Sequence, residues 1–235
     1  DLVKACSINN YNMYALLPFL SDIYKNPNLT NDAGQSILTI AISHHHYDIV
    51  DMLLSIPTID VNYSMPSIRS ALEYSVLKNN FIAFDKLIKM PQIDVHIDRS
   101  KCGAAICLAV KNNCLQMVKE IVNHKTFEPI VIDRDIKTEF HYAIDTKNNE
   151  ILNFFCDHPK YTDVLERHLA YFVIYAATKD NWTVVDFLIE KVRSFDNFLN
   201  YLYRYYETGP ISQAKKNIYQ KLKQKIEPRR YIQPV

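Results

Sequence analysis

The sequence repeats itself at a nearly constant interval, and this periodicity constrains its fold more than any other feature. Small residues that each follow a similar apolar segment are separated by 34, 34, 34 and 33 positions: Ala41, Ser75, Ala109, Ala143 and Ala176. Self-similarity at periods of roughly 20–50 residues is typical of stacked repeats, in which each unit buries apolar surface against its neighbours. We therefore expect a row of similar units and not a closed globule.

Each unit predicts two helices joined by a polar turn. The second segment of each unit has apolar residues at i, i+3 and i+4, as one buried helical face requires; these segments are 47–54, 81–88, 115–122, 149–155 and 182–189. The turn needs a residue that tolerates positive φ, and Asn is the best substitute for Gly. The residues at or beside the turns are Asn79, Asn113, Asn148 and Asn181, with His45 and His46 in the first full unit. These patterns predict an all-α chain.

The units resemble ankyrin repeats, whose period is about 33 residues. Asp32–Gly34, Ser36–Leu54 and the closing segment Ile59–Asn62 are similar to the family pattern over a whole repeat, and Thr138 and His141 restore two signature residues in a later one. The Pro that opens the first helix in the family is absent, and the last repeat lacks the sequence of the loop between repeats. The resemblance implies an ankyrin-repeat solenoid, with stacked helix–turn–helix repeats and short hairpin fingers between them.

We expect the solenoid to cover residues 1–193 and the remainder, 194–235, to form capping helices and a basic tail. The expected repeats are a partial one at about 1–30, followed by 31–64, 65–98, 99–132, 133–164 and 165–193. Residues 201–235 carry eight Lys or Arg against two acids, whereas the first 200 residues carry 19 against 24. Because the end of a solenoid must be covered by a helix with a polar outer face, we favour a cap over a basic helix for membranes or nucleic acid.

Composition excludes several classes of site. Three glycines, none close to another, argue against a phosphate-binding loop, and five cysteines without a C-x-x-C pair argue against a structural zinc site or a disulfide framework. We expect no metal, no cofactor and no catalytic residue, and we give little weight to the N-x-[ST] triplets at Asn28, Asn62 and Asn181. Neither a signal peptide nor a membrane-spanning run is visible, so we expect an intracellular, cytoplasmic protein. The chain begins at Asp1 without an initiator Met, so a targeting signal can lie outside this sequence.

The resemblance also implies where a partner binds, namely the concave face formed by the finger tips and the exposed side of the first helices. By register, nine basic candidates fall on this face: His44, Arg69, Lys78, Lys101, Lys111, Arg134, Lys137, Arg167 and Lys179. The acids at such positions are Asp32, Asp135 and Asp145. We expect this basic strip to steer a partner with an acidic segment; the alternative is that these are ordinary solvated side chains.

These observations predict a non-catalytic protein–protein interaction module that works as a monomer, such as a scaffold, adaptor or targeting arm. Two alternatives stay open. The array can be the substrate-recruitment arm of a larger enzyme, or the cytosolic assembly domain of a membrane protein. Contact with nucleic acid is not expected.

Overall fold

The computed structural model of the chain describes residues 19–65, 68–96, 104–130, 137–192, 195–208 and 212–230. Within this part every regular element is a helix, and the only bridges are two isolated antiparallel pairs, Thr30 with Ser36 and Met65 with Ile68. The predicted all-α class is therefore confirmed. The chain divides into two compact units, residues 1–128 and 129–235, and each is described by itself.

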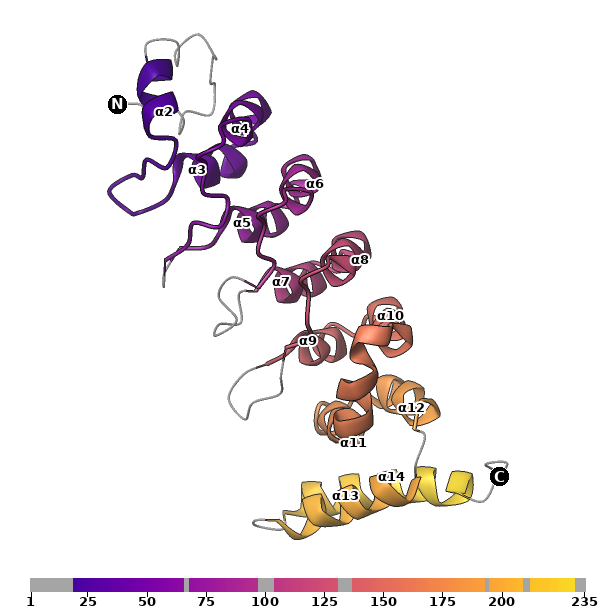
Figure 1. Cartoon of the computed structure of the whole chain (residues 1–235). Coiled ribbons are helices and arrows are strands. Elements are labelled where there is room, and N and C mark those ends of the chain that lie inside the picture. The colour runs from indigo at the N-terminus through magenta and orange to yellow at the C-terminus, as the bar shows by residue number, and fades with distance from the viewer. Residues whose placement is uncertain are drawn as a thin grey trace. The chain divides into compact units, whose positions relative to one another are not determined.

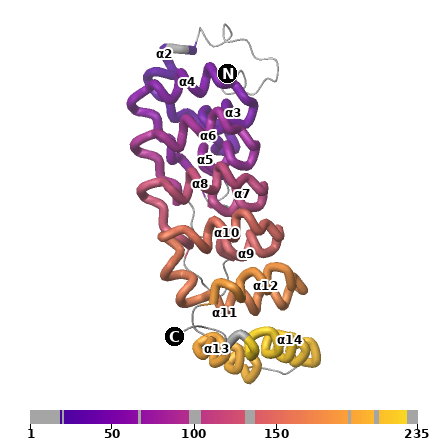
Figure 2. The backbone as a smooth tube through the Cα atoms, turned by 90° about the vertical axis from the view of Figure 1, so that its right-hand side faces the viewer, coloured from indigo at the N-terminus to yellow at the C-terminus, as the bar shows by residue number. Residues whose placement is uncertain are grey.

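The first unit contains three helix pairs that follow one another in the same orientation (Figures 1 and 2). The pairs are α3 (Ile37–Ser43) with α4 (Tyr47–Leu54), α5 (Ala71–Leu77) with α6 (Phe81–Ile88), and α7 (Ala105–Lys111) with α8 (Leu115–Asn123). A short helix, α2 (Leu20–Lys25), precedes them. The first helices α3, α5 and α7 pack side by side, and so do α4, α6 and α8. Each pair thus buries its apolar face against the next pair.

The ends of the helices follow from short polar side chains. Ser36 caps α3, because its hydroxyl accepts a hydrogen bond from the Thr39 amide at 3.2 Å. Ser70 and Glu73 form a reciprocal capping box at the start of α5. Between the helices of each pair one residue has positive φ: His45, Asn79, Asn113, Lys147 and Asp180. The left-handed turn is therefore confirmed at the first three predicted sites, whereas in the last two turns it lies one residue before Asn148 and Asn181.

A ladder of side chains joins successive loops of the first unit. Asn28, Asn62 and His96 are spaced 34 residues apart, and each reaches the same two backbone groups of the following loop. The asparagine bonds are Asn28 Nδ2 to Thr58 O (2.9 Å), Asp60 N to Asn28 Oδ1 (2.7 Å), Asn62 Nδ2 to Gln92 O (2.6 Å) and Asp94 N to Asn62 Oδ1 (2.9 Å). Asn28 and Asn62 belong to two of the three N-x-[ST] triplets, and these hydrogen bonds give both side chains a role in packing.

The second unit begins with α9 (Glu139–Asp145) and α10 (Asn149–Asp157), continues through a 3₁₀ turn (Pro159–Tyr161), and then forms α11 (Thr162–Thr178) and α12 (Trp182–Glu190). Arg167, which the register placed on the face of finger tips and first helices, is not at a finger tip, because it lies inside α11. Residues 162–178 contain no Gly, Pro or Asn that would break a helix. Pro159 starts a turn that leads directly into this long helix.

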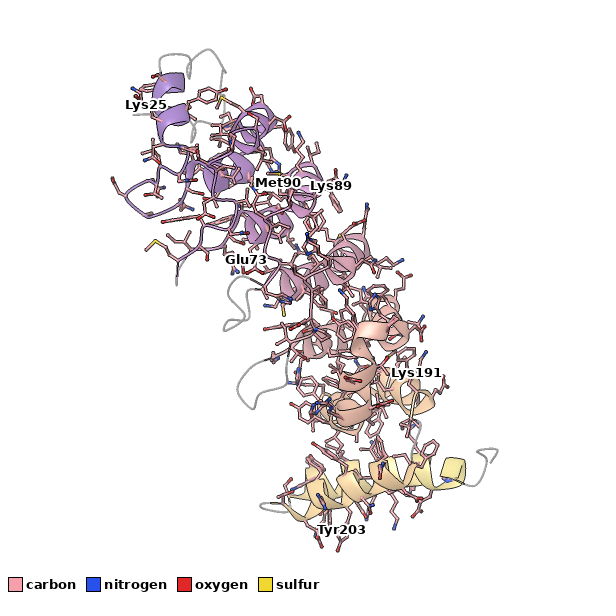
Figure 3. The ribbon with its side chains drawn as sticks, in the orientation of Figure 1. Lys25, Glu73, Lys89, Met90, Lys191 and Tyr203 are labelled. Atoms are coloured by element: carbon pink, nitrogen blue, oxygen red, sulfur yellow. The ribbon has the colours of Figure 1, made fainter. Side chains whose placement is uncertain are left out.

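Two further helices, α13 (Phe195–Glu207) and α14 (Gln213–Arg230), pack on each other and against α11. They run across the direction of α11 and α12, and Tyr203 lies on the side of α13 that faces away from them (Figure 3). In α14, Leu222 and Ile226 are buried, whereas Ala214 near the start of the helix is exposed.

Two lysines of the basic C-terminal segment are used in packing against α12. The Lys221 ammonium lies 4.8 Å from the centre of the Trp182 ring, and Lys225 pairs with Asp186 at 2.5 Å. Since Trp182 and Asp186 are one helical turn apart, these contacts tie α14 along one face of α12. In the described part of the chain, no helix combines the length and the apolar character needed to cross a bilayer.

Candidate functional site

Seven of the nine basic candidates lie in the described part of the chain; Lys101 and Arg134 lie outside it. His44, Lys78 and Lys179 are the C-cap residues of α3, α5 and α11, and Lys111 is the last residue of α7. A cation at a helix C-terminus is favoured by the helix dipole, typically by about 0.3–1 kcal/mol. Each of these residues therefore has a structural reason to be basic in addition to any role in binding.

Arg167 does not belong to this group. It lies within α11, where its guanidinium is 3.8 Å from Asp163 one turn earlier, and both side chains are largely exposed. Arg167 does not lie at a loop tip; it lines a cavity among α10, α11, α12 and α13.

Lys137 directly precedes Thr138, the N-cap residue of α9, and its charge is matched within the second unit. Its ammonium is 2.8 Å from the Asp145 carboxylate, and the Tyr175 hydroxyl donates to the same carboxylate at 3.0 Å. The hydrogen bond to Asp145 raises the pKa of Lys137. The Lys179 ammonium lies over the Tyr175 ring, 5.6 Å from its centre. Lys137 and Lys179 are thus both engaged by neighbouring side chains of the second unit.

Arg69 occupies the same position in its repeat as Lys137, but the partners are missing. Counting back by the repeat, the places of Asp145 and Tyr175 are held by Leu77 and Leu108, which offer no polar atom. The side chains of Arg69 and Lys78 form no hydrogen bond or ion pair with the residues that the structure describes. Leu77 lies between Arg69 and Lys78 in the sequence, and its side chain is 39% exposed. Among the described residues of the first unit, the charges of Arg69 and Lys78 therefore have no acidic partner, and the side chain of Leu77 next to Lys78 is exposed.

Two other repeats make a contact with the next repeat at this register. Gln35 corresponds to Arg69 one repeat earlier, and its amide donates to the Tyr74 hydroxyl of the next repeat at 3.0 Å. The Lys137 ammonium reaches the Tyr175 ring in the same way, 6.0 Å from its centre. Arg69 cannot make this contact, because Leu108 stands in the place of the tyrosine.

No protein-family model matches the chain, and no curated protein matches it at a significant level. The surface described above therefore has to be interpreted from its own chemistry.

Buried ionisable groups of α9 serve the fold. Glu139 is fully buried, and its Oε1 accepts hydrogen bonds from the Ile130 amide at 3.2 Å and the Tyr161 hydroxyl at 3.0 Å. Burial raises the pKa of Glu139 to about 7. In His141, Nδ1 accepts from the Thr138 amide at 3.0 Å and Nε2 lies 2.9 Å from the Tyr171 hydroxyl, and burial lowers the pKa to about 4. Both ring nitrogens of a neutral His141 are thus occupied.

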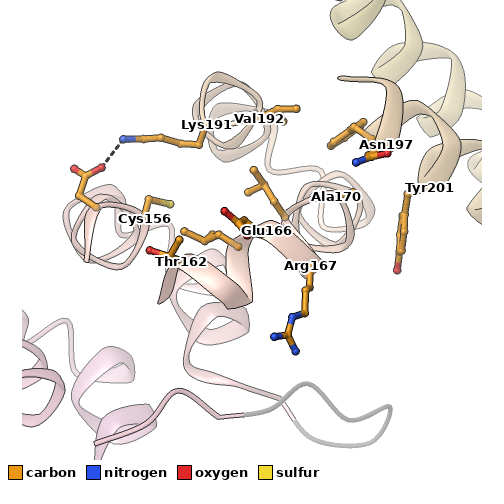
Figure 4. A pocket seen from close by; sticks show the side chains of 13 residues that line it. Cys156, Thr162, Glu166, Arg167, Ala170, Lys191, Val192, Asn197 and Tyr201 are labelled. Carbon is orange, nitrogen blue, oxygen red and sulfur yellow. Dashed lines mark hydrogen bonds and ion pairs between the residues drawn. The ribbon is translucent and has the colours of Figure 1, made fainter. Parts of the chain in front are cut away.

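A cavity of about 680 Å³ lies in the second unit (Figure 4). Its floor is apolar and includes Leu169 and Phe198, and its rim carries the ion pair between Lys191 and Asp157 at 2.9 Å. Burial raises the pKa of the Cys156 thiol to about 12, so this thiol stays protonated and a poor nucleophile. Among the described residues, no three His, Cys, Asp or Glu side chains are placed to hold a metal ion.

One exposed apolar feature was missed by the sequence argument. Phe81 and Ile82, the first residues of α6, are 46% and 48% exposed, and they border a groove of about 320 Å³ that also reaches Met117 of α8. The signal was available, because the second helices of the other repeats begin with at most one apolar residue: Tyr47-Asp48, Leu115-Gln116, Asn149-Glu150 and Trp182-Thr183.

Proposed function

We propose that this chain is an ankyrin-type repeat protein that binds an acidic segment of a protein partner and catalyses no reaction. Its docking surface is the part of the first unit that contains Arg69, Lys78 and the exposed Leu77. The observation that carries the proposal is the contrast between Arg69 and Lys137, which share a repeat position but differ in compensation.

The repeat architecture is supported by features that recur at the sequence period. The left-handed turn residues and the side-chain ladder both recur every 33 or 34 residues. Equal spacing of such contacts is what stacking of equivalent units requires, because each unit touches only its neighbours. The two isolated bridges, Thr30–Ser36 and Met65–Ile68, lie where hairpin fingers are expected.

The location of the surface is supported by electrostatics. A cation already paired within the chain, such as Lys137, gives little to a partner because the existing pair must first be broken. Arg69 and Lys78 have no ion pair with a described residue to lose when they contact a carboxylate, and Arg can bind a carboxylate with two parallel hydrogen bonds. Lys111, exposed at the end of α7, and the half-buried His44 extend the same face. The exposed side chain of Leu77 adds an apolar contact that a purely acidic ligand would not use.

Selection from a displayed library of random peptides on the immobilised chain tests the proposal. Enriched peptides should be rich in Asp and Glu and should contain an apolar residue. Their affinity should fall at least about tenfold in the double variant R69E/K78E and should fall steeply with salt. The matched control is K25E/K125E, which changes the net charge equally at exposed positions away from this surface. Peptides without acidic residues, or equal binding to R69E/K78E and wild type, would contradict it.

A further inference from the structure

The third rung of the ladder differs chemically from the first two. Asn28 and Asn62 each use two different atoms, an amide N–H that donates and a carbonyl oxygen that accepts. His96 reaches both backbone groups with one atom: its Nε2 accepts from the Glu128 amide at 2.8 Å and lies 2.9 Å from the Thr126 carbonyl oxygen. One nitrogen cannot accept from the amide and donate to the carbonyl at the same time.

We propose that His96 is a pH-sensitive rung, which exchanges its bond from the Glu128 amide to the Thr126 carbonyl when the imidazole is protonated. In the neutral ring, an unprotonated Nε2 accepts the Glu128 N–H. In the imidazolium, Nε2 carries a proton and can only donate, so it bonds Thr126 O and the Glu128 amide loses this acceptor. Histidine is the side chain that ordinarily changes charge between about pH 5 and 8.

The segment that this exchange affects is the last of the first unit, since Glu128 is the residue at which that unit ends. His96 also stacks on Phe127 of the same segment, with ring centres 5.3 Å apart. Protonation therefore leaves the ring in place but changes which backbone group it holds. The consequence is a loosening of residues 126–128 in mild acid, confined to this rung.

Other ionisable groups face the same segment and must be separated from His96. The Asp94 carboxylate accepts from the His96 amide at 2.8 Å, and Glu128 itself carries an exposed carboxylate. His124 Nδ1 lies 2.9 Å from the Thr126 hydroxyl and accepts weakly from the Thr126 amide at 3.4 Å, and Lys125 is exposed beside it. The second histidine can produce its own pH response at Thr126, so its effect has to be tested separately from that of His96.

Amide hydrogen exchange of the full chain, followed residue by residue by NMR between pH 7.5 and 5.5, tests the proposal. After correction for intrinsic exchange, protection of the Glu128 amide should fall about five- to tenfold toward pH 5.5, as expected for loss of one hydrogen bond. The Asp94 amide, held by the Asn62 rung, should keep its protection and serves as the internal control.

The variant His96→Asn restores the side chain used in the other two rungs, so Glu128 should then be protected equally at both pH values. His124→Ala should leave the response of Glu128 intact. Constant protection of Glu128 in the wild type overturns the proposal. So does a loss of protection that persists in His96→Asn, because another group would then be responsible.

Discussion

At the scale of single residues, Glu139 couples the second unit to pH. Its pKa is raised from 4.5 to about 7 because its carboxylate is buried, and its Oε2 has no hydrogen-bond partner among the described residues. The folded chain therefore holds a proton between about pH 4.5 and 7 that the unfolded chain releases. The free energy of unfolding must fall as the pH rises through this interval, since ionisation is harder in the folded state.

The variant Glu139→Gln should remove this dependence. The glutamine carbonyl can accept from Ile130 N and Tyr161 OH, and no charge is buried. We expect the variant to be more stable than wild type by on the order of 3 kcal/mol above pH 7, with little difference below pH 4.5. Urea unfolding at pH 4, 5.5 and 7.5 measures this. His141 acts in the opposite sense, because a pKa lowered to about 4 makes stability rise with pH between about 4 and 6.5; it is common to both proteins and cancels in their difference. A difference that does not grow with pH would refute the assignment to Glu139.

The contrast between Lys137 and Arg69 predicts a difference in stability as well as in binding. Replacing Lys137 by Met removes a partly exposed ion pair with Asp145, and should lower the free energy of unfolding by about 0.5–1 kcal/mol. Replacing Arg69 by Met should change it by less than about 0.3 kcal/mol, because no described partner is lost. Urea unfolding of the two variants at low salt makes the comparison, and equal losses would show that Arg69 is compensated after all.

At the scale of elements, the ladder predicts where one amide matters. Replacing Asn62 by Ala deletes two hydrogen bonds between loops, to Gln92 O and from Asp94 N, and should destabilise the first unit by about 1–2 kcal/mol. Asn200→Ala is the matched control, since Asn200 is exposed on α13 and its side chain forms no hydrogen bond with the described residues. Hydrogen exchange of α3 to α8 localises the effect. Equal stability of the two variants would mean that the ladder of hydrogen bonds contributes nothing to the stability of the first unit.

The helix pairs and their turns were predictable from the sequence because their signals are local. The apolar positions at i, i+3 and i+4 located α4, α6, α8, α10 and α12. The turn residues followed from the conformational tolerance of Asn. The long α11 was not foreseen, because a constant repeat length was imposed on a segment without helix-breaking residues.

The candidate surface was predictable only in part, because charge alone does not show compensation. The repeat register identified Arg69, Lys78 and Lys137 as candidates from their sequence positions. What it did not supply was the comparison of Asp145 and Tyr175 with Leu77 and Leu108, which decides whether a cation is free. That comparison needs the contacts between neighbouring repeats, and it could have been made from the sequence only once those contacts were known.

At the scale of the whole molecule, the two units can differ in stability, and the fluorescence of one tryptophan can follow the unfolding of one of them. Trp182 is the single tryptophan, and it lies in the second unit beneath Lys221 of α14. Its fluorescence therefore reports unfolding of the second unit, whereas circular dichroism reports the helices of both. Non-coincident transitions by the two probes would show that the units unfold separately.

Deleting residues 194–235 tests whether the terminal helices act as a cap. The deletion removes α13 and α14, which pack against α11, and it takes away the contacts of Lys221 and Lys225 with α12. Apolar residues that α13 and α14 cover would face water, so the urea midpoint followed by Trp182 should fall clearly. The amides of α3 to α8 should be as protected from hydrogen exchange as in the full chain. A repeat contacts only its neighbours, so a loss of stability at the C-terminal end is not transmitted far along the array. The control is the double variant Lys221→Gln/Lys225→Gln, which keeps both helices and should lose only a small part of the stability. An unchanged midpoint in the deletion would show that the second unit is complete without these helices.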